Sequence, residues 1–292
     1  MPFEIKYINA LNEPPGKNSD SSGKVFKMAN ELIRSMGIFS ESINYLISAT
    51  SCPDSLSPSL SQNLCSANPK LLNNTHCFDL VQGCTGGVSA FILGSKLAET
   101  KGVSVLVVQS DAAQKATSDK RSYYSIFGNG AFTALLVNKS TGSCLLYSKS
   151  YQVPGLEEIV KIRLGHDADE IIKDQKKVSE DPRYFLGLEL DNSMAIKLLK
   201  SSKTFYLLFV KESCEPDVLI LHQVNPRIIG FLKLFLNDFK GEFIDVSAEI
   251  GNCGAATTGI AYYKTQDRLK GKKVLICSFG TGGVITAGLW QF

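Results

Sequence analysis

The chain has 292 residues, of which 44% are hydrophobic and 20% charged, as is ordinary for a soluble globular protein. This composition excludes disordered and fibrous proteins. The 31 basic and 28 acidic residues nearly balance to a net charge of +3, which argues against a nucleic-acid or membrane binder. The N-terminus lacks a signal-peptide pattern, and no apolar run approaches membrane-spanning length. We therefore expect a cytoplasmic protein.

Short β-branched runs alternate with helix-like stretches along the chain. The predicted strands span residues 43–50, 77–81, 103–110, 131–137, 217–221, 243–246, 273–279 and 284–290. The predicted helices span residues 23–36, 86–100, 191–211, 226–239 and 254–269. This order predicts an α/β protein with a parallel or mixed sheet covered on both faces.

The two halves of the chain resemble each other. Residues 44–49 correspond to 217–222, and the helix 86–100 corresponds to 254–269; in both halves a strand, a glycine-rich turn and a closing strand follow. We interpret this as a duplicated αβ unit with halves 1–145 and 146–292 that form one compact unit. The alternative is the general likeness of strands and helices in any α/β chain. Polar segments 12–22 and 161–181 are expected as loops.

Cys84 lies where an apolar strand-like run ends and a small-residue helix-like run begins. A cysteine at the first turn of a helix feels the positive end of the helix dipole, which favours the thiolate and makes it a nucleophile. The alternative is a buried cysteine that acts as a small hydrophobe. The other reactive residues of the chain must decide between the two.

The eight cysteines show no C-x-x-C pair and no histidine at metal-ligand spacing, so we expect free thiols and no metal site. Of the three histidines, His76 and His166 lie in polar or charged segments and are expected at the surface. His222 instead ends a predicted buried strand, a typical position for a functional residue. The alternative is a helix-capping cluster in which Asn225 caps the next helix and His222 bonds to backbone.

Two further segments suit a catalytic site. Asn252 lies among small residues opposite the Cys84 segment in the repeat, and its amide donates hydrogen bonds without titrating. The glycine-rich turn 279–283 is suited to presenting backbone N–H groups to an oxyanion. Each signal is weak alone, since an ordinary asparagine or a common turn would look the same.

Cys84 in segment 82–87, His222 in segment 222–228 and Asn252 in segment 251–256 together resemble the Cys-His-Asn triad of β-ketoacyl-acyl-carrier-protein synthase III, a family of thiolase-fold condensing enzymes. Further similar segments follow in family order across nearly the whole chain: 49–51, 110–111, 127–131 and 279–283. The resemblance implies a thiolase-like fold, in which duplicated αβ halves place central buried helices between mixed sheets.

The resemblance also implies an acyltransferase mechanism. Cys84 would take an acyl group from coenzyme A or acyl carrier protein, and His222 and Asn252 would hold a malonyl-type thioester during decarboxylative condensation. The backbone of Cys84 with Thr281 or Gly282 would form the oxyanion hole. Residues implied to bind substrate or coenzyme A are Arg121, Gln223, Asn225 and Phe279. No permanent cofactor is implied, and the partner would be a second copy or a related chain in a dimer.

The chain also departs from the family pattern. Its N-terminus is shorter by a few tens of residues and lacks the family's early Thr-Gly-Ile segment and arginine, and Gln82 and Gly83 replace small alanine-like residues. These departures suggest an enzyme of a specialised fatty-acid or polyketide pathway. Two alternatives stay open: acyl transfer from Cys84 to a non-malonyl oxygen, nitrogen or carbon nucleophile, and a non-catalytic subunit of a heteromeric synthase.

Overall fold

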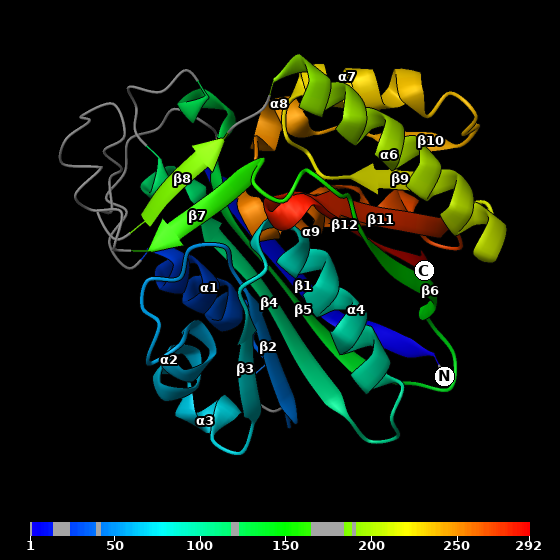
Figure 1. The fold of residues 1–292 in the computed structure, drawn as a ribbon. Helices are drawn as coiled ribbons and strands as arrows, with labels where there is room; N and C mark the ends of the chain where they lie inside the picture. The colour runs from blue at the N-terminus through cyan, green and yellow to red at the C-terminus, as the bar shows by residue number, and fades with distance from the viewer. Residues whose placement is uncertain (1, 14–23, 39–41, 118–122, 165–183, 189–190) are drawn as a thin grey trace, which may run out of the picture.

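The computed structural model describes residues 2–13, 24–38, 42–117, 123–164, 184–188 and 191–292 (Figure 1). Its N-terminal part forms a five-stranded mixed sheet in the order β1-β5-β4-β2-β3. The strands are β1 (Phe3–Glu13), β2 (Tyr45–Ala49), β3 (His76–Leu80), β4 (Ser104–Ala112) and β5 (Asn129–Asn138). Strand β2 pairs in parallel with β3 and β4, whereas β5 runs antiparallel to both β4 and β1.

The C-terminal part repeats this arrangement in a second five-stranded sheet, ordered β10-β9-β11-β12-β6. Its strands are β6 (Cys144–Gln152), β9 (Val218–Leu221), β10 (Glu242–Ile244), β11 (Lys273–Phe279) and β12 (Val284–Gln291). Three parallel strands are again followed by two antiparallel ones. The duplicated topology is therefore present. The boundary between residues 145 and 146 falls just inside β6 and stays a prediction.

Two short helices, α4 (Gly86–Ala98) and α9 (Thr257–Thr265), are buried between the sheets and touch strands of both. Their small residues permit this close packing. A side chain at Gly87 would overlap the carbonyl oxygen of Ala255, and the indole of Trp290 donates a hydrogen bond to Ser95 Oγ at 3.0 Å. The helices thus join the two halves around one shared core.

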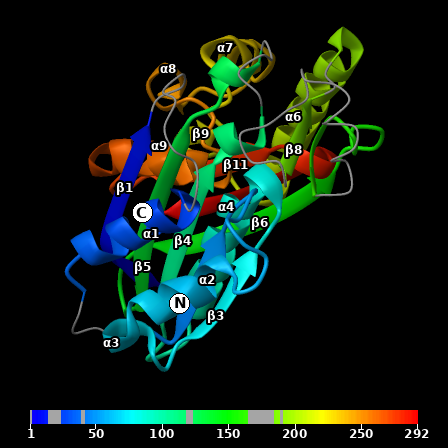
Figure 2. The same ribbon diagram turned by 90° about the vertical axis from the view of Figure 1, so that its left-hand side faces the viewer.

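Further helices cover the outer faces of the sheets, as Figures 1 and 2 show. Helices α1 (Lys24–Ser35), α2 (Leu60–Ala67) and α3 (Pro69–Leu72) lie on the first sheet. Helices α6 (Asn192–Glu212) and α7 (Pro226–Phe235) lie on the second, with the short helix α8 (Ser247–Ile250) next to α7. No helix in these described ranges has both the length and the hydropathy to cross a membrane.

The structure confirms the predicted strands and helices, with shifts at their ends. Helix 226–239 ends earlier, at Phe235, and the segment 254–269 opens with a 3-10 turn before α9. The edge strands β1 and β6 and the hairpin β7 (Val160–Leu164) and β8 (Tyr184–Leu188) were missed. Strand β1 reaches Glu13 and β7 starts the segment expected as a charged loop. The rest of that loop to residue 181, with His166, lies outside the described residues.

Candidate active site

Cys84 lies in a 3-10 turn, Gly83–Thr85, between β3 and α4. Gly83 begins this turn with a φ of +55°, and a side chain there would overlap Thr281, so the position requires glycine. The second half of the chain fixes the turn from the other side, because Ser278 Oγ on β11 donates a hydrogen bond to the Cys84 carbonyl at 2.8 Å. Cys84 therefore sits at the junction of the two halves, and its side chain keeps part of its surface accessible.

His222 follows β9 directly and is 1% exposed. No described residue makes a hydrogen bond to either ring nitrogen, so the expected alternative of a backbone-bonded histidine does not hold. Its ring meets Phe279 edge to face, with centroids 5.7 Å apart. A buried imidazole with two unused nitrogens is suited to binding a polar atom of a ligand.

Asn252 is held by the first half of the chain. Its backbone N–H donates to Ile126 at 2.8 Å, and its carbonyl accepts from Gly128 at 3.0 Å. The side-chain Oδ1 accepts from the Gly254 N–H at 3.0 Å. Because this bond occupies the oxygen, the amide NH2 is the end turned to serve as a donor.

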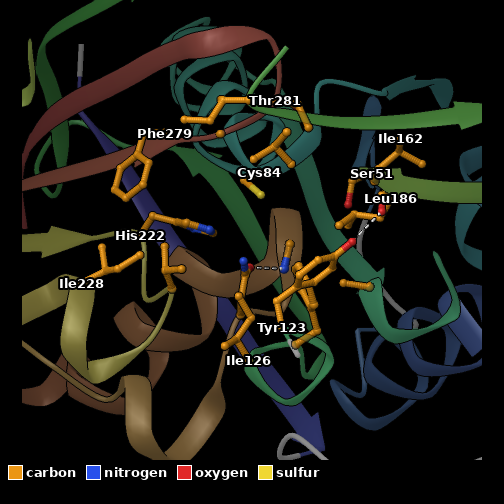
Figure 3. A pocket seen from close by; sticks show the side chains of 18 of the residues that line it. Ser51, Cys84, Tyr123, Ile126, Ile162, Leu186, His222, Ile228, Phe279 and Thr281 are labelled. Carbon is orange, nitrogen blue, oxygen red and sulfur yellow. Dashed lines mark hydrogen bonds between the residues drawn. The ribbon is translucent and has the colours of Figure 1, made fainter. Parts of the chain in front are cut away.

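Cys84, His222 and Asn252 all line one cavity of about 330 Å³ (Figure 3). In Figure 3 the thiol lies between His222 and Phe279 on one side and Ser51, Ile162 and Leu186 on the other. Most of the remaining wall is apolar. Its members are Ala113, Ile126, Phe127, Leu156, Ile159, Val160, Ile162, Leu186, Leu198, Val224, Ile228, Phe279 and Val284. The cavity thus joins three reactive groups from distant segments to a surface that suits a hydrocarbon chain.

Burial sets the protonation of the cavity's two titratable groups. It raises the pKa of Cys84 to about 12, with a further contribution from Asp111, while the cysteine's own backbone N–H opposes the shift. Burial likewise lowers the pKa of His222 to about 4, and the Asn252 side chain opposes this shift. The expected thiolate was therefore wrong for the resting protein, because desolvation outweighs the helix end. A neutral thiol and a neutral imidazole face each other across the cavity.

The glycine-rich turn lies directly against Cys84. A Cβ at Gly280 would be 2.9 Å from Cys84 Cβ and 3.3 Å from its Sγ. The N–H of Gly280 donates to Val284, and that of Gly283 donates to Gly280. Thr281 lines the cavity beside them, and Gly282, at a φ of +72°, completes the turn. The N–H groups of Thr281 and Gly282 stay the predicted oxyanion donors of this turn.

The remaining predicted residues separate in the structure. Phe279 and Asn225 line the cavity, and Asn225 also caps α7 by accepting from the Ile228 N–H at 2.9 Å. Gln223 is not part of the wall, because its amide bonds to the backbone of Leu221, Ile244 and Val246. Arg121 lies outside the described residues. Gln82, expected to alter the pocket, is exposed and does not line it.

Sequence reasoning missed the hairpin wall. Ile162 on β7 pairs with Leu186 on β8, and both line the cavity. Their segment begins a highly charged stretch, and the two strands are far apart in sequence, so no local pattern indicated a hairpin. Ser51 was noted only as part of a family-like segment without a role, yet it also lines the cavity.

Comparison with known proteins finds similar sequences and similar folds. The family model described as the C-terminal part of 3-oxoacyl-[acyl-carrier-protein] synthase III matches residues 212–292. A β-ketoacyl-[acyl-carrier-protein] synthase III of Clostridium perfringens is 26% identical over 289 residues, covering 96% of this chain and 85% of that protein.

Two solved structures share the fold. The 3-oxoacyl-[acyl-carrier-protein] synthase III of Aquifex aeolicus superposes with a TM-score of 0.74 at 20% identity, covering 95% of this chain and 86% of that one. A variant of OleA from Xanthomonas campestris gives a TM-score of 0.76 at 14% identity, covering 100% and 99%. At these identities the likeness concerns the fold. It is the thiolase-like fold, two duplicated halves with central helices between mixed sheets.

The repeated sheets and the central helices together define a protein of the thiolase-like fold. Over most of its length the chain is similar to β-ketoacyl-[acyl-carrier-protein] synthase III proteins, and the model of their C-terminal part matches residues 212–292.

Proposed function

We propose that the protein condenses two thioesters with loss of CO₂, using Cys84 as the acyl-carrying nucleophile. The observation that carries this proposal is the convergence of Cys84, His222 and Asn252 on one apolar cavity. In the first step the Cys84 sulfur would attack the carbonyl carbon of an acyl thioester. The thioester would expel its carrier thiol, which takes up the proton of Cys84. The N–H groups of Cys84 and of Thr281 or Gly282 would stabilise the oxyanion.

In the second step a malonyl-type thioester would lose CO₂, and its carbonyl oxygen would gather negative charge. Two neutral donors stabilise such an enolate without losing a proton themselves. The low pKa of His222 and the oriented amide of Asn252 support this role. The enolate carbon would then attack the acyl-Cys84 and release the Cys84 thiolate.

The apolar wall supports an aliphatic acyl group as the donor. Ile126, Phe127, Ile162 and Leu186 offer hydrocarbon surface, and charged side chains are not among the described lining residues. Coenzyme A and acyl carrier protein are both compatible carriers, and no permanently bound cofactor is invoked. We keep the proposal of a specialised pathway and of a dimer with itself or a related chain. Deletion of the gene tests the specialised role. If straight-chain fatty-acid initiation stays normal, the role is supported. If this initiation is lost and no other activity is impaired, the role is overturned.

The first alternative, acyl transfer to an oxygen, nitrogen or carbon nucleophile other than malonyl, requires His222 as a general base. A pKa near 4 makes His222 a weak base at neutral pH, which favours condensation. The second alternative, a non-catalytic subunit, does not explain why both ring nitrogens of His222 are buried without a hydrogen-bond partner among the described residues.

Intact-mass measurement with a panel of acyl-coenzyme A and acyl-carrier-protein donors tests the first step. An acyl adduct that disappears in C84A supports the nucleophile, and its absence with every donor favours a non-catalytic subunit. Product analysis with malonyl thioesters tests the second step. CO₂ release with a β-ketoacyl product supports condensation, whereas an ester, an amide or a free acid without CO₂ release contradicts it.

A further inference from the structure

A buried carboxylate lies behind the catalytic cavity. Asp111, near the end of β4, is 0% exposed. Its Oδ2 accepts the Ser51 N–H at 3.0 Å, the Ser51 hydroxyl, and the Ala255 N–H at 2.9 Å. Its Oδ1 accepts the Cys52 thiol at 3.2 Å. Within the described part of the chain no ion pair joins this carboxylate, so uncharged donors stabilise it.

These donors come from segments that build the cavity. Ser51 follows β2 and lines the cavity wall. Ala255 lies in the 3-10 turn Gly254–Ala256, three residues after Asn252. A side chain at Gly254 would overlap the Asp111 carboxylate, and the N–H of Gly254 fixes the Asn252 amide. Asp111 therefore connects the wall residue Ser51 to the loop that orients Asn252.

We propose that Asp111 is a positioning residue of this active site, whose buried carboxylate fixes Ser51 and the loop 252–256. A shift of Ser51, or of the loop that orients Asn252, would then disturb the hydrogen bonds of Asp111. The inference rests on the proposed role of Cys84 as nucleophile, but its test does not require any substrate.

The charge of Asp111 acts on the thiols around it. It contributes to raising the pKa of Cys52, Cys84 and Cys253, in each case after burial. Lys115 and Asp54, which form an ion pair at 2.8 Å, act on Cys52, and neither contributes to the pKa shift of Cys84. His222, the other titratable cavity residue, is neutral at pH 7 because burial lowers its pKa to about 4. Asp111 is thus the negative charge that bears on Cys84.

The test is the rate at which iodoacetamide alkylates Cys84 between pH 7 and 9, read at the Cys84 peptide by mass spectrometry. The variant D111N keeps the shape but removes the charge, and we expect alkylation roughly tenfold faster at each pH, since one fewer negative charge opposes the thiolate. The variant S51A keeps the charge but removes a donor that partly neutralises it. We expect its alkylation to be slower than in the wild type.

The matched control is D79N. Asp79 is a partly buried carboxylate that also accepts N–H groups, those of Leu60 and Ser61, but it does not contribute to the pKa shift of Cys84. The variant D79N should lower the melting temperature and leave Cys84 alkylation unchanged.

Faster alkylation in D111N alone supports the inference. Unchanged alkylation in D111N, or equal acceleration in S51A and D79N, overturns it, because loosening would then explain the result. If D111N does not fold, the sign of the S51A effect decides: slower supports the inference and faster contradicts it. A missing acyl adduct with normal alkylation behaviour would count against the proposed function alone.

Discussion

The two central 3-10 turns, Gly83–Thr85 and Gly254–Ala256, have the same backbone conformation but present different chemical groups. Gly83 and Gly254 each begin their turn with a φ of +55°, and each turn leads into a buried helix. Each turn is also fixed from the opposite half, the first by Ser278 on β11 and the second by Asp111 on β4. The duplicated fold thus supplies two equivalent frames. The first presents a thiol to the cavity, and the second follows the amide donor Asn252.

The largest expected effect concerns the thiols of the two turns. Cys84 lines the cavity, whereas Cys253, at the start of the second turn, is fully buried and does not. We expect C84A to abolish the acyl adduct, and C253A to keep acylation within a few-fold of the wild type. Intact mass after incubation with acyl thioesters measures both. Undiminished acylation in C84A would show that the first turn does not carry the nucleophile.

Removal of either neutral donor should have the next largest effect. H222A or N252A should lower the rate of malonyl-thioester decarboxylation by about 10²–10³, the usual loss for one preorganised oxyanion donor. The Cys84 adduct should still form, because the first step uses backbone donors. CO₂ release and adduct formation are measured on the same preparations. If a folded H222A or N252A variant loses both adduct formation and decarboxylation, these residues do not act in the second step alone.

Much of this arrangement could be predicted from the sequence, because strand and helix periods are local and the repeat sets their order. Cys84, His222 and Asn252 were each placed at an element end by local pattern, and the cavity brings them together. The resting thiol was not predictable, because the pKa of Cys84 depends on burial and on Asp111, which lies 27 positions away. The hairpin wall formed by Ile162 and Leu186 was missed for the same reason, since its two strands meet only in three dimensions.

The buried imidazole of His222 should make the free energy of unfolding depend on pH between about 4 and 6.5. Its folded pKa, about 4, lies below the ordinary value of 6.5, so the unfolded chain binds the proton more readily. The free energy of unfolding should fall as pH drops from about 6.5 to 4, by up to about 3 kcal/mol from this residue. Urea unfolding across this window measures the slope. H222Q should flatten it, and an unchanged slope in H222Q would show that His222 is not the buried neutral group described.

The smallest expected effect tests the shared backbone of the two turns. Replacing Gly83 by alanine forces a side chain into a positive-φ position and against Thr281, at a cost of about 1–3 kcal/mol. Gly102 also has a positive φ, +76°, but a Cβ there meets nothing within 4 Å. G102A should therefore cost only the backbone strain, and it should leave acylation unchanged. G83A should cost more in thermal unfolding and also slow acylation, because it displaces Thr281 in the turn proposed to hold the oxyanion. If both variants lose equal stability and G83A acylates normally, close packing between the turn 83–85 and Thr281 does not position the nucleophile.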